Sequence, residues 1–226
     1  MAYEEGDFIK IDYVGTVKDS GEIFDTTKQE EADKEGLQYE DPSRFKPMVV
    51  CLGQDQVLDG LDKELQGKED GQYTIELEPE EAFGKKKSDL LKLIPKREFK
   101  SKEVDPYPGL ELTIDGQRGT VRSVSGGRVI VDFNHPLASK ELIYEVEILG
   151  EVEDVEEQVN SFLENLGIPN ESLTVEDGEA TIMMEQPLPE QITNQLKEQI
   201  EEAVDVEVTF TSEQAEDEET AEEEKE

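Results

Sequence analysis

The chain has 226 residues, which is enough for one large domain or for two or three small ones. It contains 59 acidic and 22 basic residues, and the formal net charge of −37 argues against binding to nucleic acid or to an anionic membrane face, since both would repel it. The acidic residues lie throughout the chain. We therefore favour a folded protein with a surface suited to high salt over the alternative of an acidic disordered segment.

Location and cofactors are constrained by what the sequence lacks. No apolar run approaches the ~18 residues of a membrane span, and the N-terminal MAYEEGDFIK has no basic start followed by an apolar core, as a signal peptide would. The single cysteine, Cys51, excludes an intrachain disulfide and lies in the apolar run MVVCLG, so we expect a small buried core residue and not a nucleophile. The sequence predicts a soluble cytoplasmic protein that needs no metal and no other cofactor.

The first elements are extended. Alternation predicts a half-buried strand whose inward positions are Ile9, Ile11, Tyr13, Gly15 and Val17. KDSG ends this strand as a turn, and EIFD resumes extended structure. Residues 26–47 are polar without an apolar period and predict a long surface excursion, after which MVVCL predicts a strand.

A short helix and two further strands complete this part of the chain. QVLDGLDKEL places Val57, Leu58, Leu61 and Leu65 on one helical face. QYTIELEP and, much later, ELIYEVEIL alternate cleanly and predict strands. Antiparallel strands wrapped round one short helix make an α+β domain.

Between Phe83 and Asn134 the sequence changes character. GKKKSDLLKLIPKREF is locally basic, and LELTIDGQRGTVRSVSGGRVIVDF is a set of short β segments with DG and SGG at the turns. This pattern predicts a small all-β unit. Its apolar strand positions fit an internal core as well as a binding surface: Leu112, Ile114, Val121, Val129 and Val131.

A third region follows Gly150. VEDVEEQVNSFLENLG has a helical apolar stripe, SLTVEDGEATIMM predicts a hairpin around EDGE, PLPEQITNQLKEQIEEAV predicts a second helix, and DVEVTF predicts a last strand. The order α-β-β-α-β in about 60 residues is that of a small domain. From Ser212 onward the acidic sequence has no apolar content and predicts a disordered tail.

The motifs YVGTV, GEIFDTT, VVCLGQDQVLDGLDKELQGKEDGQ, PEEAFG and LIYEVEIL, in this order, resemble those of FKBP-type peptidyl-prolyl isomerases, over roughly residues 4–84 and 137–150. The part between them resembles the insert-in-flap chaperone domain of SlyD-like and archaeal long-type members, and NHPLASKEL resembles the segment that returns to the catalytic domain. The resemblance implies four regions: an FKBP-like α+β domain with an antiparallel sheet wrapped on a short helix (1–86 and 135–150), an inserted all-β domain (87–134), a C-terminal α+β domain (151–211) and a disordered acidic tail (212–226).

The resemblance also implies a substrate pocket. Its catalytic residues would be Tyr13, Phe24, Asp25, Val57, Leu58, Leu61, Phe83 and Tyr144, and its further substrate-binding residues Met48, Ala82, His135 and Leu137. The backbone N–H of Leu58 would donate to the substrate. Leu61 replaces a tryptophan of many members, and Phe83 replaces a tyrosine whose hydroxyl binds ligand. Spacing alone favours an ordinary core role for Phe24, Val57, Leu58 and Leu61, and the resemblance of the ordered motifs reverses that preference.

His135 is the only histidine, which invites a catalytic or metal-binding interpretation. The resemblance favours a different role, in which His135 shapes the junction loop through hydrogen bonds. A metal site is not expected, because the histidine-rich tail of some SlyD-like proteins is absent and a diffuse acidic surface is not a site.

The implied activity is rotation of X–Pro bonds in unfolded or nascent polypeptides, which are the expected partners. The barrier of roughly 18–20 kcal/mol comes from amide resonance, and an apolar pocket favours the twisted amide without acid or base. The insert would hold unfolded chains near the pocket, and the C-terminal domain would form a homodimer through its exposed last strand. Two alternatives are a holdase that binds chains without turnover and a structural dimerisation protein with a vestigial pocket.

Overall fold

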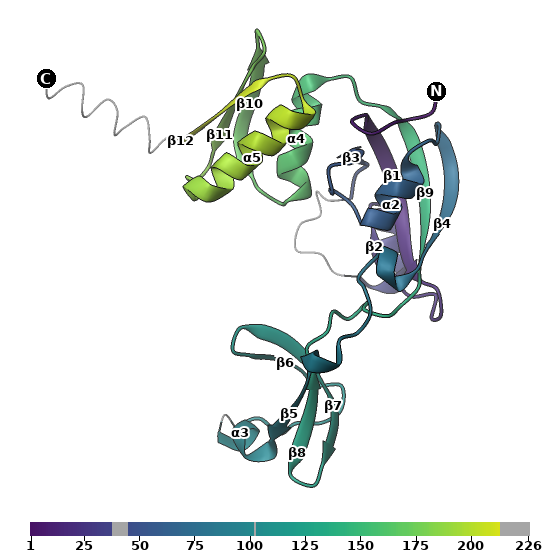
Figure 1. The fold of residues 1–226 in the computed structure, drawn as a ribbon, viewed down its shortest axis with the longest axis vertical. Coiled ribbons are helices and arrows are strands. Elements are labelled where there is room, and N and C mark those ends of the chain that lie inside the picture. The colour runs from purple at the N-terminus through teal and green to yellow at the C-terminus, as the bar shows by residue number, and fades with distance from the viewer. Residues whose placement is uncertain (38–44, 102, 213–226) are drawn as a thin grey trace, which may run out of the picture. The chain divides into compact units, whose positions relative to one another are not determined.

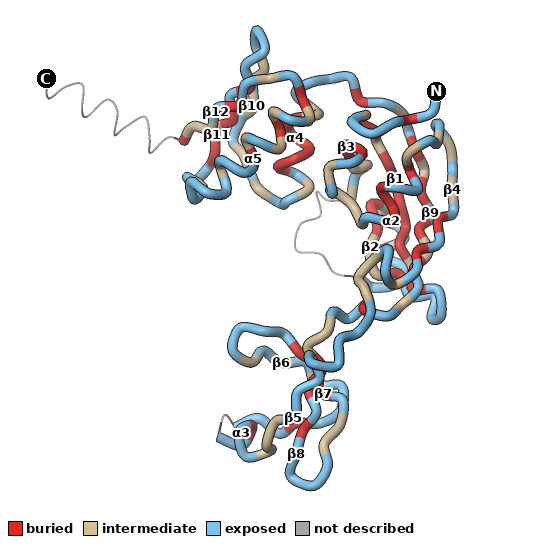
Figure 2. Tube along the Cα trace, in the orientation of Figure 1, coloured by how far each residue is buried: buried red, intermediate tan, exposed pale blue. Residues whose placement is uncertain are grey.

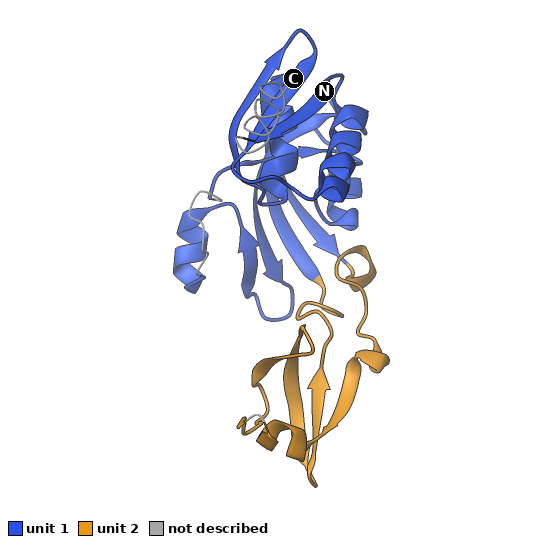
Figure 3. Cartoon of the chain, turned by 90° about the vertical axis from the view of Figure 1, so that its left-hand side faces the viewer, with its two compact units in different colours: residues 1–77, 142–226 blue, residues 78–141 orange. Residues whose placement is uncertain are grey.

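The computed structural model describes residues 1–37, 45–101 and 103–212 (Figure 1). The chain divides into two units, residues 1–77 with 142–226 and residues 78–141 (Figure 3). The predicted tail lies outside the described residues except for Ser212, which ends the last strand. Among the described residues, no helix is long and apolar enough to span a membrane.

The larger unit is built on an antiparallel sheet. Its strands are β1 (Phe8–Val17), β2 (Ile23–Thr26), β3 (Met48–Cys51), β4 (Gly71–Leu77) and β9 (Leu142–Glu151). The order is β2-β1-β9-β4, with β3 also paired to β1, so β9 lies between β1 and β4 although it comes last in the sequence. The predicted alternation is confirmed, because the odd-numbered positions of β1 and the even-numbered positions of β9 from Leu142 to Ile148 are buried (Figure 2).

Two short helices accompany this sheet. Helix α2 (Asp59–Leu65) buries Leu61 and Leu65, as predicted, but it begins after Val57 and Leu58, so the prediction that these two residues share its helical face was wrong. Helix α1 (Gln29–Glu35) lies within the predicted surface excursion, and the sequence did not predict this helix. The helix has no apolar period because Ala32 is its only buried residue. It ends at Gly36, whose positive φ favours glycine.

The smaller unit contains a four-stranded antiparallel sheet of order β5-β8-β7-β6. Its elements are the 3₁₀ turns η2 (Pro79–Glu81) and η3 (Ser88–Leu90), strands β5 (Leu91–Pro95), β6 (Glu111–Ile114), β7 (Gln117–Ser125) and β8 (Arg128–Asp132), and helix α3 (Lys96–Ser101). The core consists of Phe99, Val121, Val129 and Val131. Helix α3 was not predicted, because Phe99 is its one buried residue and a single apolar position sets no period.

The C-terminal region of the larger unit follows the predicted order α-β-β-α-β. It consists of α4 (Val155–Asn165), β10 (Asn170–Glu176), β11 (Glu179–Met184), α5 (Glu190–Ala203) and β12 (Glu207–Ser212). Strand β11 pairs antiparallel with β10 and parallel with β12. The face turned away from the helices is polar, and Glu179 lies directly opposite Glu176 on one side and Glu207 on the other.

This C-terminal region shares a core with the main sheet. Phe8, Val49 and Cys51 belong to the same buried cluster as the apolar faces of α4 and α5. The rings of Phe8 and Phe162 meet edge to face with centroids 6.2 Å apart. The two parts are therefore packed as one body through apolar contacts, which ion pairs such as Lys10 with Glu157 supplement at the surface.

Candidate functional site

Three side chains of the predicted pocket, Tyr13, Asp25 and Tyr144, meet on one face of the main sheet. Gly15 on β1 lies opposite Asp25 on β2 and opposite Tyr144 on β9. Tyr13 lies two residues before Gly15 on the same strand, so it points to the same side. The rings of Tyr13 and Tyr144 lie with centroids 5.7 Å apart.

A β-bulge adds Phe24 to this face. The pairing of β1 with β2 passes from Gly15–Asp25 directly to Thr16–Ile23, which leaves Phe24 as an extra residue. In a regular strand, Phe24 and Asp25 would point to opposite faces, whereas a bulge re-aims one of them. The Phe24 ring packs edge to face on Tyr144, with centroids 5.7 Å apart and an interplanar angle of 83°.

Asp25 is the hydrogen-bond acceptor of the cluster. The Tyr13 hydroxyl donates to Asp25 Oδ2 at 2.8 Å, and the Thr26 N–H donates to Asp25 Oδ1 at 3.0 Å. Burial and the nearby charge of Asp25 raise the pKa of Tyr144 well above its ordinary value, so this phenol stays protonated. The cluster thus presents mainly aromatic surface.

Two threonines that sequence reasoning missed hold the backbone of Tyr13. Thr27 Oγ1 accepts the Tyr13 N–H at 2.8 Å, and the Thr26 hydroxyl donates to the Tyr13 carbonyl at 2.8 Å. Both threonines are buried. The signal was the TT that follows Phe-Asp in EIFDTT, because β-branched hydroxyl residues can bond a neighbouring backbone.

Further apolar residues of the predicted pocket lie in and just before α2 and on strand β3. Leu58 is the N-cap of α2, where backbone N–H groups have no partner within the helix, and its carbonyl accepts the Asp62 N–H at 2.9 Å. Val57 and Leu58 are half-buried, whereas Leu61 is buried. Met48 lies opposite Ile11, so it points to the same face as Tyr13.

The remaining predicted residues belong to the smaller unit. The rings of Phe83 and His135 stack with centroids 4.2 Å apart and an interplanar angle of 7°. His135 Nδ1 accepts the Leu137 N–H at 3.2 Å, which is a hydrogen bond of the kind that a loop-shaping role requires. Partial burial lowers the pKa of His135 below its ordinary value. Ala82 follows η2 next to Phe83.

The predicted residues are divided between the two units of the chain. The larger unit holds Tyr13, Phe24, Asp25, Met48, Val57, Leu58, Leu61 and Tyr144, and the smaller unit holds Ala82, Phe83, His135 and Leu137. Direct contacts join Tyr13, Phe24, Asp25 and Tyr144 within the first group and Phe83 with His135 within the second. A single pocket that includes both groups stays a prediction.

Known proteins resemble this chain at the level of sequence. A short-type peptidyl-prolyl cis-trans isomerase of Methanocaldococcus jannaschii is 30% identical over 146 residues, which cover 64% of this chain and 91% of that protein. An FKBP-type 16 kDa peptidyl-prolyl cis-trans isomerase of Escherichia coli is 34% identical over 109 residues, which cover 46% of this chain and 73% of that protein. The chain belongs to the FKBP-type peptidyl-prolyl cis-trans isomerases.

Other similarities concern parts of this FKBP-type isomerase. The SlyD isomerase of Helicobacter pylori is 32% identical over 120 residues, which cover 50% of this chain and 64% of that protein. The family model described as FKBP26, IF domain, matches residues 92–137, within the smaller unit. The solved N-terminal domain of FKBP42 from Arabidopsis thaliana matches 67% of this chain with 16% identity and a TM-score of 0.36, which is too weak a likeness to support an argument.

Two other features of this FKBP-type isomerase are explained by its packing. Cys51 is a buried core residue, as predicted, and burial raises the pKa of its thiol to about 12, which makes it a poor nucleophile.

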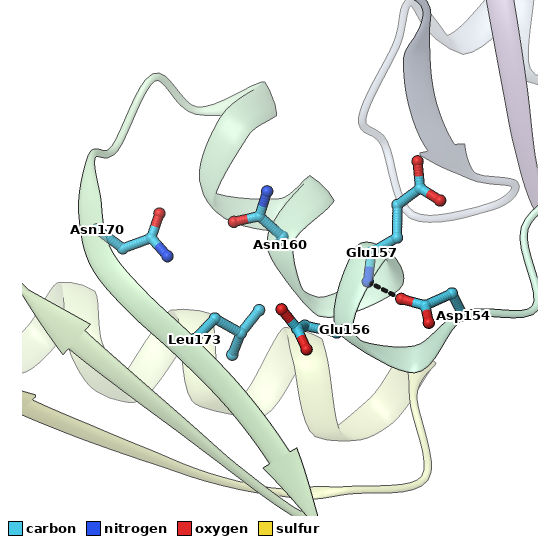
Figure 4. A pocket seen from close by; sticks show the side chains of 6 residues that line it. All are labelled: Asp154, Glu156, Glu157, Asn160, Asn170 and Leu173. Carbon is cyan, nitrogen blue, oxygen red and sulfur yellow. Dashed lines mark hydrogen bonds between the residues drawn. The ribbon is translucent and has the colours of Figure 1, made fainter.

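A polar hollow beside α4 is lined by Asp154, Glu156, Glu157, Asn160, Asn170 and Leu173 (Figure 4). Two of its carboxylates already have partners, since Asp154 accepts the Glu157 N–H as helix cap and the Glu157 side chain pairs with Lys10. Nowhere in the described part of the chain do three acidic, histidine or cysteine side chains gather so as to hold a metal.

A buried carboxylate ties the smaller unit to its two connecting segments. Burial alone would raise the pKa of Asp132, but hydrogen bonds from Asn134, Arg122 and Lys86 hold it well below its ordinary value. Asn134 also exchanges two hydrogen bonds with the backbone of Lys87. The segments that enter and leave the insert are thereby paired side by side, and sequence reasoning had not identified this network.

Proposed function

We propose that this isomerase rotates X–Pro bonds of unfolded or nascent polypeptides against the cluster of Tyr13, Phe24, Asp25 and Tyr144. The observation that carries the proposal is that these side chains meet on one face of the sheet, where the three rings pack together and the Tyr13 hydroxyl donates to Asp25. A substrate proline would meet mainly aromatic and aliphatic surface there.

This surface suits a reaction that needs neither acid nor base. The planar amide is stabilised by resonance, and the twisted transition state has lost much of it and is less dipolar. Surroundings that solvate the twisted form relatively better than the planar form lower the barrier. The backbone N–H of Leu58, at the start of α2, is the expected donor to the substrate carbonyl.

Two substitutions relative to many family members bear on specificity. Leu61 offers a shallower floor than an indole ring, and Phe83 has no hydroxyl to donate to a ligand. We therefore expect proline turnover to be retained, because the walls stay apolar, while affinity for macrolide-type inhibitors falls, because one hydrogen bond is lost.

The test is protease-free cis-to-trans relaxation of a short X–Pro peptide across a salt series. Phe24→Ala and Asp25→Ala should reduce catalysis in folded protein, whereas Asp19→Ala, which removes a turn carboxylate of the same unit, should not. Folding is checked by circular dichroism at each salt concentration. Absence of catalysis in folded wild-type protein would favour the holdase alternative.

The insert is proposed to hold unfolded chains. Its apolar hollow between α3 and β6 is lined by Ile94, Glu98, Phe99, Val104, Leu112, Thr113 and Ile114. On the opposite face of its sheet, Leu93 of the edge strand β5 is 55% exposed and lies opposite Ile130, which is also exposed. Apolar side chains left in solvent on a small domain are typical of a surface that binds another chain.

Deletion of the insert separates holding from turnover. Because Lys87 and Asn134 are hydrogen bonded, residues 88–133 can be replaced by a short Asn-Gly turn without separating the connecting segments. Turnover of short peptides should be retained, whereas catalysis of proline-limited refolding of a protein should fall, because the client is no longer held nearby. Equal loss in both assays would contradict this division of labour.

The proposal places the protein in the cytoplasm, as a homodimer with a surface adapted to high salt. Strand β12 lies at the end of the order β10-β11-β12, where it could pair with a second copy once the Glu201 side chain releases the Val208 N–H that it accepts at 2.8 Å. Light scattering at high protein and salt concentrations tests the dimer, and a monomer under those conditions would refute it.

A further inference from the structure

Gly15 stands at the centre of the aromatic cluster, although nothing in its own backbone requires glycine. Its φ lies outside the left-handed region, so any residue can adopt this conformation. Glycine inside a strand weakens it and often marks a place where another group approaches closely. The other inward positions of β1, such as Ile11 and Tyr13, carry large side chains.

The approaching group is the ring of Phe24. A Cβ atom added to Gly15 would lie 2.8 Å from Phe24 Cζ and 3.2 Å from each of its Cε atoms. A distance of 2.8 Å is shorter than real Cβ contacts and 3.2 Å is tighter than most, so the ring fills the space that a side chain at this position would need. Asp25 and Tyr144 lie directly across from Gly15 on the two neighbouring strands, so the gap is bounded on both sides by cluster residues.

We propose that Gly15 is a positioning residue for catalysis, whose missing side chain sets the depth at which Phe24 lies and hence the space left for the substrate proline. The bulge on β2 turns Phe24 toward this face, and the absence of a side chain at Gly15 leaves room for the ring. The inference rests on the proposed role of Phe24 as a wall of the site. It concerns a residue that need not touch the substrate itself.

The first variant is Gly15→Ala. The clashing atoms are the far end of the half-buried Phe24 side chain, so the ring moves outward while the strand is retained. For a short X–Pro peptide we expect kcat to fall about tenfold with KM nearly unchanged. This fall corresponds to an interaction energy between positions 15 and 24 in the middle of the range measured for residues in contact. The NMR resonances of the Tyr144 ring should shift, because Phe24 packs edge to face on it.

A double-mutant cycle with Phe24→Leu shows whether Gly15 acts through the ring. In the Phe24→Leu background, Gly15→Ala should cost less than about twofold further, because the displaced ring is already gone. Multiplicative losses in the double variant would overturn the inference and leave the role of Phe24 intact. Wild-type kcat in Phe24→Leu alone would instead refute the proposed site, and this inference with it.

Gly119→Ala is the matched control. Gly119 is also a strand glycine outside the left-handed region, and a Cβ there would lie 2.8 Å from the ring of Phe133 in the smaller unit. The chemical change is the same, but the added Cβ would also lie 2.8 Å from Cγ1 of the buried Val131, and both groups belong to the insert core or its surroundings, so folding of the insert is checked in this variant. Peptide kcat should stay at the wild-type value, and an equal fall in this variant would overturn the assignment of a special role to Gly15.

Discussion

The row of glutamates on the C-terminal sheet offers a direct test of how salt stabilises this protein. Glu179 on the central strand lies opposite Glu176 and Glu207, so three like charges cross the sheet. Two unit charges about 5 Å apart in water repel by about 0.8 kcal/mol. Because exposed carboxylates splay apart, we expect the two pairs together to cost about 1 kcal/mol at an ionic strength of about 0.1 M.

The perturbation is Glu179→Gln, and the matched control is Glu145→Gln. Glu145 is also exposed and also on a central strand, but it lies opposite Val14 and Thr74. Both variants change the net charge equally. Glu179→Gln should raise the free energy of unfolding by about 1 kcal/mol at about 0.1 M salt, and by only a few tenths at about 1 M, where the Debye length falls from about 10 to about 3 Å.

The assay is urea unfolding followed by circular dichroism across the salt series, because urea adds no ions. Glu145→Gln should change stability by less than about 0.3 kcal/mol throughout. Equal gains in the two variants would mean that net charge matters and the row does not. No gain in either would refute the reasoning that cross-strand repulsion contributes to salt dependence.

Three further predictions follow from single contacts. Tyr13→Phe keeps the ring but removes the hydroxyl that donates to Asp25, so kcat/KM for a short peptide should fall about fivefold, the equivalent of about 1 kcal/mol; an unchanged value would show that this hydrogen bond does not support catalysis. Phe162→Ala should lower the free energy of unfolding of the larger unit by about 3–4 kcal/mol, measured with urea, and a loss confined to C-terminal signals would contradict a shared core with Phe8. Asp132 has a lowered pKa in the folded state, so its stabilisation of the insert is present above the ordinary aspartate value of about 4 and is lost as pH falls below it; Asp132→Asn should remove this part of the pH dependence in unfolding curves, and an unaltered pH dependence would refute it.

Periodicity predicted most of the fold because most elements bury one regular face. The inward positions of β1, β4 and β9 and the stripes of the two C-terminal helices follow from alternation and helical spacing. The helices α1 and α3 escaped because each buries a single residue, Ala32 in one and Phe99 in the other. A single apolar position carries no period that could be read.

The site was harder to predict than the fold, since its geometry depends on departures from regular structure. Alternation places Phe24 and Asp25 on opposite faces, and only the bulge brings both to Tyr144. A bulge changes pairing with another strand and leaves no fixed signature in its own residues. The identities of these residues came from the ordered motifs, whereas their mutual placement, and the reason for Gly15, came from the pairing of strands.

The strand order also has a consequence for synthesis of the chain. Strands β1 and β4 are joined only through β9, so the main sheet cannot close before residues 142–151 have left the ribosome. Leu77 and Leu142 are directly opposite partners, which makes everything between them the loop of one long hairpin. At about 5–20 residues per second, synthesis from Asp132 at the end of β8 to Leu142 at the start of β9 takes about 0.5–2 s, during which the insert can fold. Once folded, with Lys87 and Asn134 bonded, it brings the two ends of the loop together, so the isomerase domain closes over a short effective distance.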